Sequence, residues 1–147
     1  MPALALVAAG CGGNGGSTPT ARDRAADASA RRFAVSVQAQ LRRGQFERAW
    51  RSLHPAQKRF VSAQRLTSCY PRNVYPRTVT FRATEVQQVR WHVPGTAGLS
   101  DADAVTVTAT SRGRTVDVFE QHIVRSGGTW RWMLSRVFFD RARRGAC

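Results

Sequence analysis

The chain has 147 residues, of which 42% are hydrophobic and 9% are aromatic, enough apolar side chains for one ordinary globular core. Its 23 basic and 9 acidic residues give a formal net charge of +14, and every basic residue except Lys58 is arginine. These values exclude a largely disordered or acidic protein, and a positive field of this size attracts anions.

The first residues resemble the N-terminal signal of a bacterial lipoprotein. A short apolar run ends in the small residues Ala9 and Gly10, Cys11 follows, and a Gly/Ser-rich stretch comes next. Small residues before the cysteine suit signal-peptidase cleavage, and the thiol is the group that receives the lipid. The run is too short for a transmembrane helix, which needs about 20 apolar residues. We expect a signal over 1–10, lipidated Cys11 with a tether over 11–20, and a single domain after it, over 21–147.

This N-terminal pattern has two departures from the usual one. Ala8 stands where such motifs more often have Leu, and residues 1–10 contain no Lys or Arg, although secretory leaders normally begin with basic residues. One interpretation is that the true start lies upstream of Met1. Another is an internal apolar helix with a buried free cysteine, which the many glycines after it disfavour.

The sequence contains three cysteines, an odd number that is awkward for an exported protein. Lipidation of Cys11 leaves Cys69 and Cys147 as a pair in an oxidising compartment, where a disulfide persists. Such a bridge would contribute about 4 kcal/mol through loop entropy. The alternative is two unpaired thiols in a cytosolic protein. With no CxxC motif or Cys/His cluster in the sequence, we expect no metal site and no cofactor.

A helical period dominates the first half of the domain. Phe33, Val37 and Leu41 recur at four-residue steps, and Gly44 is a typical helix stop. The expected helices cover 21–43 and 45–53, with a third from Pro55 and a fourth from near Ser62.

The period changes to two after Tyr75-Pro76, which predicts strands. Alternation slips beyond Ala83, so a bulge or bend is expected over 85–88. The remaining expected elements are a loop over 94–101, strands containing 105–109, 115–125 and 130–138, and turns at 111–114 and 126–128. Helices first and an antiparallel meander after them predict an α+β domain.

The stretch from Phe33 to Leu53 is similar to the helix-Gly-helix opening of the nuclear transport factor 2-like superfamily. The matching residues are Gly44-Gln45 followed by Phe46-Glu47-Arg48-Ala49-Trp50, with a later Ala104–Val107 strand and a Gly128–Trp132 hairpin. The resemblance covers about residues 25–140. It implies N-terminal helices packed on a strongly bent antiparallel sheet, a cone with an apolar pocket. The superfamily includes exported lipoproteins, isomerases, dehydratases and structural modules, so the fold leaves function open.

Enzymes with this fold place a carboxylate, often with His or Tyr, inside the cone. The candidates here are Glu85, Asp117, Glu120 and His122. Glu120 and His122 lie two apart in one predicted strand and therefore share a face, making a weak catalytic pair. Polar residues at this spacing are also typical of a solvated face. We expect His54 and His92 to be structural or surface residues.

Two arginine-containing segments have binding interpretations. Trp130-Arg131-Trp132 resembles a single-strand nucleic-acid platform, but in a strand both tryptophans share one side, which favours core packing and no specific nucleic acid. The anion-binding candidates form a basic C-terminal patch: Arg141, Arg143 and Arg144. Anionic lipid headgroups, wall polymers or an acidic protein are the partners that such a patch would attract.

The leading hypothesis is a membrane-anchored, non-enzymatic binding or interaction module at the outer face of a bacterial cytoplasmic membrane. Its expected partners are membrane lipid, through acylated Cys11, and an apolar small ligand or a protein. One alternative is a small exported isomerase-like or dehydratase-like enzyme that uses Glu120 and His122. Another is a surface protein that binds anionic polymer or lipid, and pairing into a homodimer through the open sheet face is a further alternative.

Overall fold

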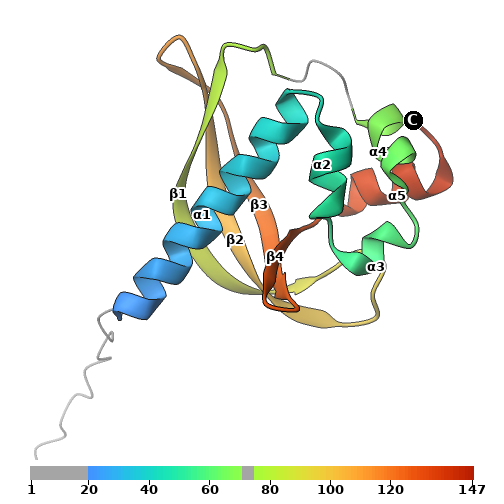
Figure 1. Cartoon of the computed structure of the whole chain (residues 1–147), viewed down its shortest axis with the longest axis horizontal. Helices are drawn as coiled ribbons and strands as arrows, with labels where there is room; N and C mark the ends of the chain where they lie inside the picture. The colour runs from blue at the N-terminus through green and yellow to red at the C-terminus, as the bar shows by residue number, and fades with distance from the viewer. Residues whose placement is uncertain (1–19, 71–74) are drawn as a thin grey trace, which may run out of the picture.

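We describe the protein from a computed structural model, which covers residues 20–70 and 75–147 (Figure 1). In chain order its elements are α1 (Ala21–Arg42), α2 (Phe46–Arg51), α3 (Pro55–Lys58), α4 (Ala63–Cys69), β1 (Val79–His92), β2 (Leu99–Ser111), β3 (Arg114–Ser126), β4 (Thr129–Trp132) and α5 (Arg136–Arg144). The strands form one antiparallel sheet in the order β1-β2-β3-β4, so the predicted α+β class is confirmed. The predicted signal, Cys11 and the tether up to residue 19 lie outside the described residues.

The long helix α1 agrees with its prediction at both ends. It begins with a capping box, in which the Thr20 hydroxyl accepts a hydrogen bond from the Asp23 amide and the Asp23 carboxylate accepts one from the Thr20 amide. Its buried side chains are Ala30, Ala34, Val37, Gln38 and Leu41. Gly44, with a φ of 73°, leads the chain into α2. The buried stripe places α1 across one face of the sheet (Figure 1).

Strand β1 contains the predicted irregularity. Its pairing with β2 shifts between Ala83 and Glu85, slightly before the predicted interval of 85–88. Phe81 and Ala83 pack against the core before the shift, and Val86 does so after it. One extra residue thus lets side chains at an odd spacing face the same side of the sheet.

The predicted loop over 94–101 is too long. β2 begins at Leu99, and Asp101 lies opposite Arg90 in the β1–β2 ladder. Because β1 extends to His92, it offers partners to these early β2 residues, which sequence patterning alone does not reveal.

The predicted strand over 130–138 is wrong beyond Trp132. The chain leaves the sheet there and forms α5, whose first turn is capped by the Ser135 hydroxyl accepting from the Phe138 amide at 3.3 Å. Phe139 and Ala142, three residues apart, are buried on one side of this helix. Helical spacing and the cap therefore outweigh the alternation that predicted a strand.

The tryptophans of β4 face the helices, as core packing requires. The Trp130 indole N–H donates to the Ser29 hydroxyl at 2.9 Å, and the Trp132 indole N–H donates to the Ala49 carbonyl at 2.6 Å. Trp132 is buried and Trp130 partly buried against the main core. These bonds attach β4 to α1 and α2 and confirm the predicted packing of both rings.

Candidate functional site

Glu120 and His122 of β3 share the sheet face directed away from α1. Gln121 between them is buried and accepts a hydrogen bond from Gln38 of α1, and neighbouring residues in a strand point to opposite faces. The His122 Nε2 and Glu120 Oε2 atoms are 4.0 Å apart, with 14% of the histidine side chain and 60% of the glutamate side chain exposed. The predicted pair therefore forms, but on the outer face of the sheet.

The surroundings of His122 are aromatic. Its ring stacks on Trp91 of β1, with ring centroids 3.5 Å apart, and the indole itself is an exposed side chain. Burial lowers the pKa of His122, while the nearby Glu120 carboxylate acts in the opposite direction. The surface has two hollows, one between α1 and the sheet and one beside the Cys69–Cys147 bond, and neither residue of the pair lines either of them. The pair thus lacks the enclosed setting that general acid–base catalysis would use.

The other two acidic candidates also lie outside these hollows. Glu85 is exposed and accepts a hydrogen bond from the Gln87 side chain at 2.8 Å. Asp117 is exposed and accepts a hydrogen bond from the Tyr75 hydroxyl, and burial together with this bond raises the pKa of Tyr75. Each of these two carboxylates is therefore bonded to a neighbouring side chain.

His54 and His92 make local contacts. The His54 Nδ1 accepts from the Ala56 amide at 3.2 Å and caps α3, and burial followed by the Arg131 charge lowers the pKa of His54. The His92 Nδ1 lies 3.2 Å from a guanidinium nitrogen of Arg136. His54 thus has a capping role, and His92 lies in an exposed contact with α5.

A first hollow, the sheet hollow, lies between the start of α1 and the sheet and has a volume of about 490 Å³. Its apolar lining residues are Ala26 and Trp130, together with Val89, Ala102 and Val124. The last three side chains pack together on the opposite face of the sheet. Its polar lining consists of Gln88, Arg90, Asp101, Asp103 and Arg125. Clefts of this size that combine an apolar wall with a few polar groups are typical of small-molecule sites.

Two contacts involve the charged side chains of the sheet hollow, one an ion pair and the other a cation–π contact. Arg90 and Asp101 form an exposed ion pair at 3.4 Å, and the Arg125 guanidinium lies 5.0 Å from the centre of a Trp130 ring. Burial raises the pKa of Asp103, with the Asp27 charge acting in the same direction and Arg125 opposing them. Asp103 therefore holds its proton to a higher pH than an aspartate in water does.

Asp103 was missed among the sequence candidates, although a signal was present. It lies two residues before Val105 and four before Val107, both buried in the main core. Strand alternation alone places all three on the face directed toward α1. The predicted strand pattern began at Val105 and the predicted loop ended at residue 101, so Asp103 was assigned to neither.

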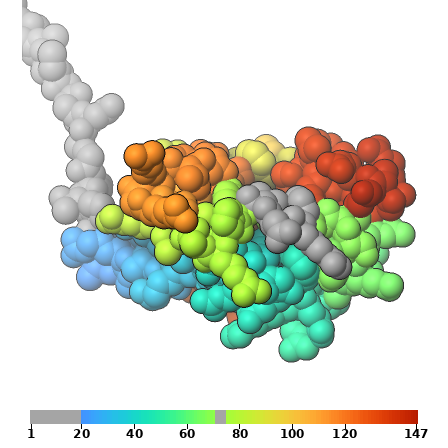
Figure 2. All heavy atoms as spheres, turned by 90° about the horizontal axis from the view of Figure 1, so that it is seen from above, coloured from blue at the N-terminus to red at the C-terminus, as the bar shows by residue number. Residues whose placement is uncertain are grey.

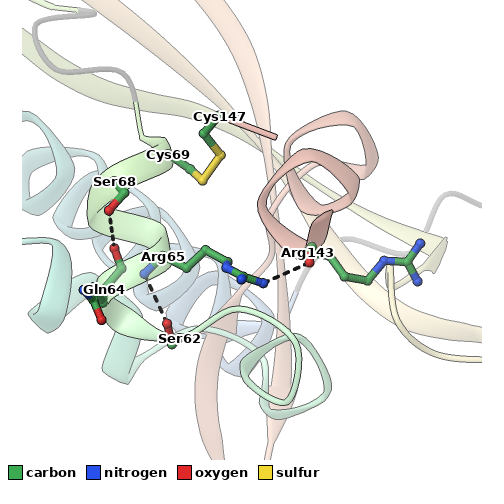
Figure 3. The surroundings of a disulfide bond; sticks show 7 residues. All are labelled: Ser62, Gln64, Arg65, Ser68, Cys69, Arg143 and Cys147. Atoms are coloured by element: carbon green, nitrogen blue, oxygen red, sulfur yellow. Dashed lines mark hydrogen bonds between the residues drawn. A yellow bond between two sulfur atoms is a disulfide. The ribbon is translucent and has the colours of Figure 1, made fainter. Parts of the chain in front are cut away.

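A second hollow, the disulfide hollow, lies beside the bond between Cys69 and Cys147. Figure 3 shows this bond and the residues around it. The two Cα atoms are 4.9 Å apart across 78 positions of sequence, so the predicted pairing is confirmed. The volume is about 700 Å³, and the lining comprises Lys58, Arg59, Phe60, Ser62, Gln64, Arg65, Ser68, Cys69, Gly145 and Cys147. The Arg65 guanidinium donates to the Arg143 carbonyl at 2.9 Å and bridges α4 to α5 (Figure 3).

The predicted basic patch lies next to this hollow but does not line it. Its residues are Arg141, Arg143 and Arg144 of α5. Arg143 pairs with Asp140 at 3.7 Å and lies over the Phe139 ring. The cations that do line the hollow belong to the segment from α3 to α4 and were missed, because only tertiary packing brings that segment beside α5.

Among the residues that the structure describes, no group of three or more His, Cys, Asp or Glu side chains is placed to hold a metal ion. No helix in the same part of the chain is both long and apolar enough to cross a membrane. Comparisons with family models, with curated proteins and with solved structures give no match.

Proposed function

We propose that the chain is an exported bacterial lipoprotein, anchored through Cys11, whose domain is a non-enzymatic binding module of the nuclear transport factor 2-like type. The observation that carries the binding role is the sheet hollow, with its aromatic side chain and its few polar groups. Its ligand is a small molecule with an apolar part, which lies against Trp130 and Ala26, and a polar part, which meets Asp103.

The order of the elements supports the cone-type fold. A long first helix packs on one face of an antiparallel meander, and a glycine with a positive φ separates it from the next helix at Gly44. The bulge in β1 adds a bend to the longest strand. The sheet hollow lies where this fold type has its pocket, between the first helix and the sheet.

The position of Glu120 and His122 favours binding over the enzyme alternative. That alternative needs both side chains in an enclosed apolar pocket, whereas Glu120 is mostly exposed and His122 packs on Trp91. The sheet hollow lies at another part of the sheet and is lined by different residues.

Filling the sheet hollow tests the binding role. Ala26 and Ala25 are both exposed on α1, but only Ala26 lines the hollow, so Ala26→Trp blocks it and Ala25→Trp is a matched control. The probe is a neutral fluorescent dye, N-phenyl-1-naphthylamine, titrated into the full chain. We expect Ala26→Trp to abolish most of the saturable fluorescence increase and Ala25→Trp to retain it. Equal titrations for both variants and the parent would contradict the assignment.

Fatty-acid labelling tests the anchor separately. We expect label on the parent chain and on the double variant Cys69→Ser/Cys147→Ser, and none on Cys11→Ser. Equal labelling of the parent and Cys11→Ser would refute lipidation at Cys11, whatever the outcome of the dye titration.

A further inference from the structure

The charged side chains that line the disulfide hollow are all of one sign. Lys58, Arg59 and Arg65 contribute three cationic side chains, and no lining side chain is acidic. None of the four ion pairs found among the described residues involves any of these three. This distinguishes the disulfide hollow from the sheet hollow, whose lining contains two arginines and two aspartates.

Two of the three cations are held in place by backbone carbonyls. The Lys58 ammonium donates to the Arg51 carbonyl at 2.5 Å and lies 4.8 Å from the centre of the Trp50 ring. Arg65 donates from one guanidinium nitrogen, Nη1, to the Arg143 carbonyl, which leaves its other N–H groups available. Arg59 is exposed, and no hydrogen bond of its side chain is found in the described part of the chain. The hollow thus combines fixed cations with unused donors.

A neutral hydroxyl group completes the donor set. The Ser62 oxygen accepts a hydrogen bond from the Arg65 amide at 3.1 Å, so the hydroxyl proton of Ser62 remains free to donate. The Gln64 side chain, in contrast, points away from the Arg65 guanidinium (Figure 3). The Ser62 hydroxyl and the two guanidinium groups offer more donors than the two oxygens of a carboxylate can accept, and they suit a phosphate group with its three acceptor oxygens.

We propose that the disulfide hollow binds the phosphate group of a soluble phosphate-bearing molecule. A volume of about 700 Å³ lies within the range of small-ligand sites. Planar guanidinium groups, here from Arg59 and Arg65, match phosphate oxygens in pairs. The site adds a second binding function to the sheet hollow and is independent of the ligand proposed there.

The location of the hollow favours a soluble ligand over a bilayer headgroup. Figure 2 shows the first turns of α1 at one end of the molecule and the C-terminal segment at the other. α1 has 22 residues and therefore a length of about 33 Å. This step rests on the proposed anchor at Cys11. With that anchor, the end of the domain near Thr20 is the one next to the membrane, and the disulfide hollow lies at the far end.

The test measures binding of sodium tripolyphosphate to the full chain by calorimetry at low salt. Arg59→Gln removes a side chain that makes no described structural contact, and Arg22→Gln removes an equal charge from the exposed start of α1. We expect Arg59→Gln to weaken binding about tenfold, in line with the loss of a charge-assisted hydrogen bond, and Arg22→Gln to change it less than twofold. Equal effects of the two variants, or no saturable binding by the parent chain, would overturn the proposal.

A second arm distinguishes the source of the phosphate. Vesicles of phosphatidylglycerol are sedimented with Cys11→Ser protein and with the same protein carrying Arg59→Gln. We expect the two to sediment equally, because the hollow is not used for a bilayer. Sedimentation that depends on Arg59 would replace the soluble ligand with a lipid surface. Dye binding in the sheet hollow is expected to survive Arg59→Gln, so failure of this site and failure of the proposed function are distinguishable.

Discussion

The two ends of the molecule differ in charge and in how they are held. At the sheet hollow, the two lining carboxylates, Asp101 and Asp103, are matched by two lining arginines, Arg90 and Arg125. At the disulfide hollow, a covalent bond joins α4 to Cys147 and the lining side chains include no acid. The net charge of +14 is therefore shared unequally between the two hollows, because charged side chains balance in the lining of one and are all cationic in the lining of the other.

Removing the disulfide is expected to have the largest effect on this comparison. The double variant Cys69→Ala/Cys147→Ala should lose about 2–4 kcal/mol of unfolding free energy, because the unfolded chain regains the freedom of a long loop. Urea unfolding measures the loss. Ser68→Ala, on the same helix and exposed, should change the free energy by less than about 0.5 kcal/mol. A double variant as stable as the parent would mean that packing alone holds the α5 end.

The attachment of α1 to the sheet is expected to show the next largest effect. Gln38 and Gln121 are both buried and bonded to each other, so Gln121→Ala leaves a buried amide without its partner and should cost about 1–3 kcal/mol. The double variant Gln38→Leu/Gln121→Leu should lose less than the single one, because no polar group is left unpaired. Urea unfolding of both proteins checks the order, and the reverse order would contradict it.

A smaller loss is expected at the sheet hollow itself. Trp130→Phe removes the indole N–H that donates to the Ser29 hydroxyl and should cost about 1 kcal/mol. Ser29→Ala breaks the same bond, so the double variant should lose less than the sum of the two single variants. Additive losses in a thermodynamic cycle would show that this hydrogen bond does not link β4 to α1.

The smallest effect is expected from Asp103, and it depends on pH. Burial raises the pKa of this carboxyl above its unfolded value of about 3.8, so the unfolded chain releases the proton at a lower pH than the folded chain does. The free energy of unfolding therefore falls as the pH rises from the unfolded pKa to the folded pKa. Asp103→Asn should therefore raise the melting temperature at pH 7 and lose this gain below about pH 4. Asp101→Asn, which removes an exposed ion-pair partner of Arg90, should give no gain. A gain from Asp103→Asn that persists at pH 3 would point to another cause.

The elements with a clear period could be predicted from the sequence, and the C-terminal one could not. The four-residue steps around Val37 and the period of two after Pro76 follow from which side of an element is buried, and this is local information. After β4 the sequence fits both a continued strand and a capped helix. The Ser135 cap and the burial of Phe139 favour the helix.

The candidate sites divide in the same way. The Cys69–Cys147 pair follows from counting cysteines, and the shared face of Glu120 and His122 follows from strand spacing. Which face lies under α1 depends on tertiary packing, and so does the approach of Arg65 to α5. The sequence pattern therefore identified the pair of sulfur atoms but neither hollow.

Because of the register shift between Ala83 and Glu85, the effect of deleting one residue from β1 depends on where the deletion falls. Deleting Thr84, the residue between them, would keep the pairing on both sides and only straighten the strand. Deleting Gln88 instead would turn Val89 and every later residue of the strand to the opposite face. In evolutionary terms, β1 has one position where the loss of a residue is tolerated, and length differences among homologues are expected to collect there.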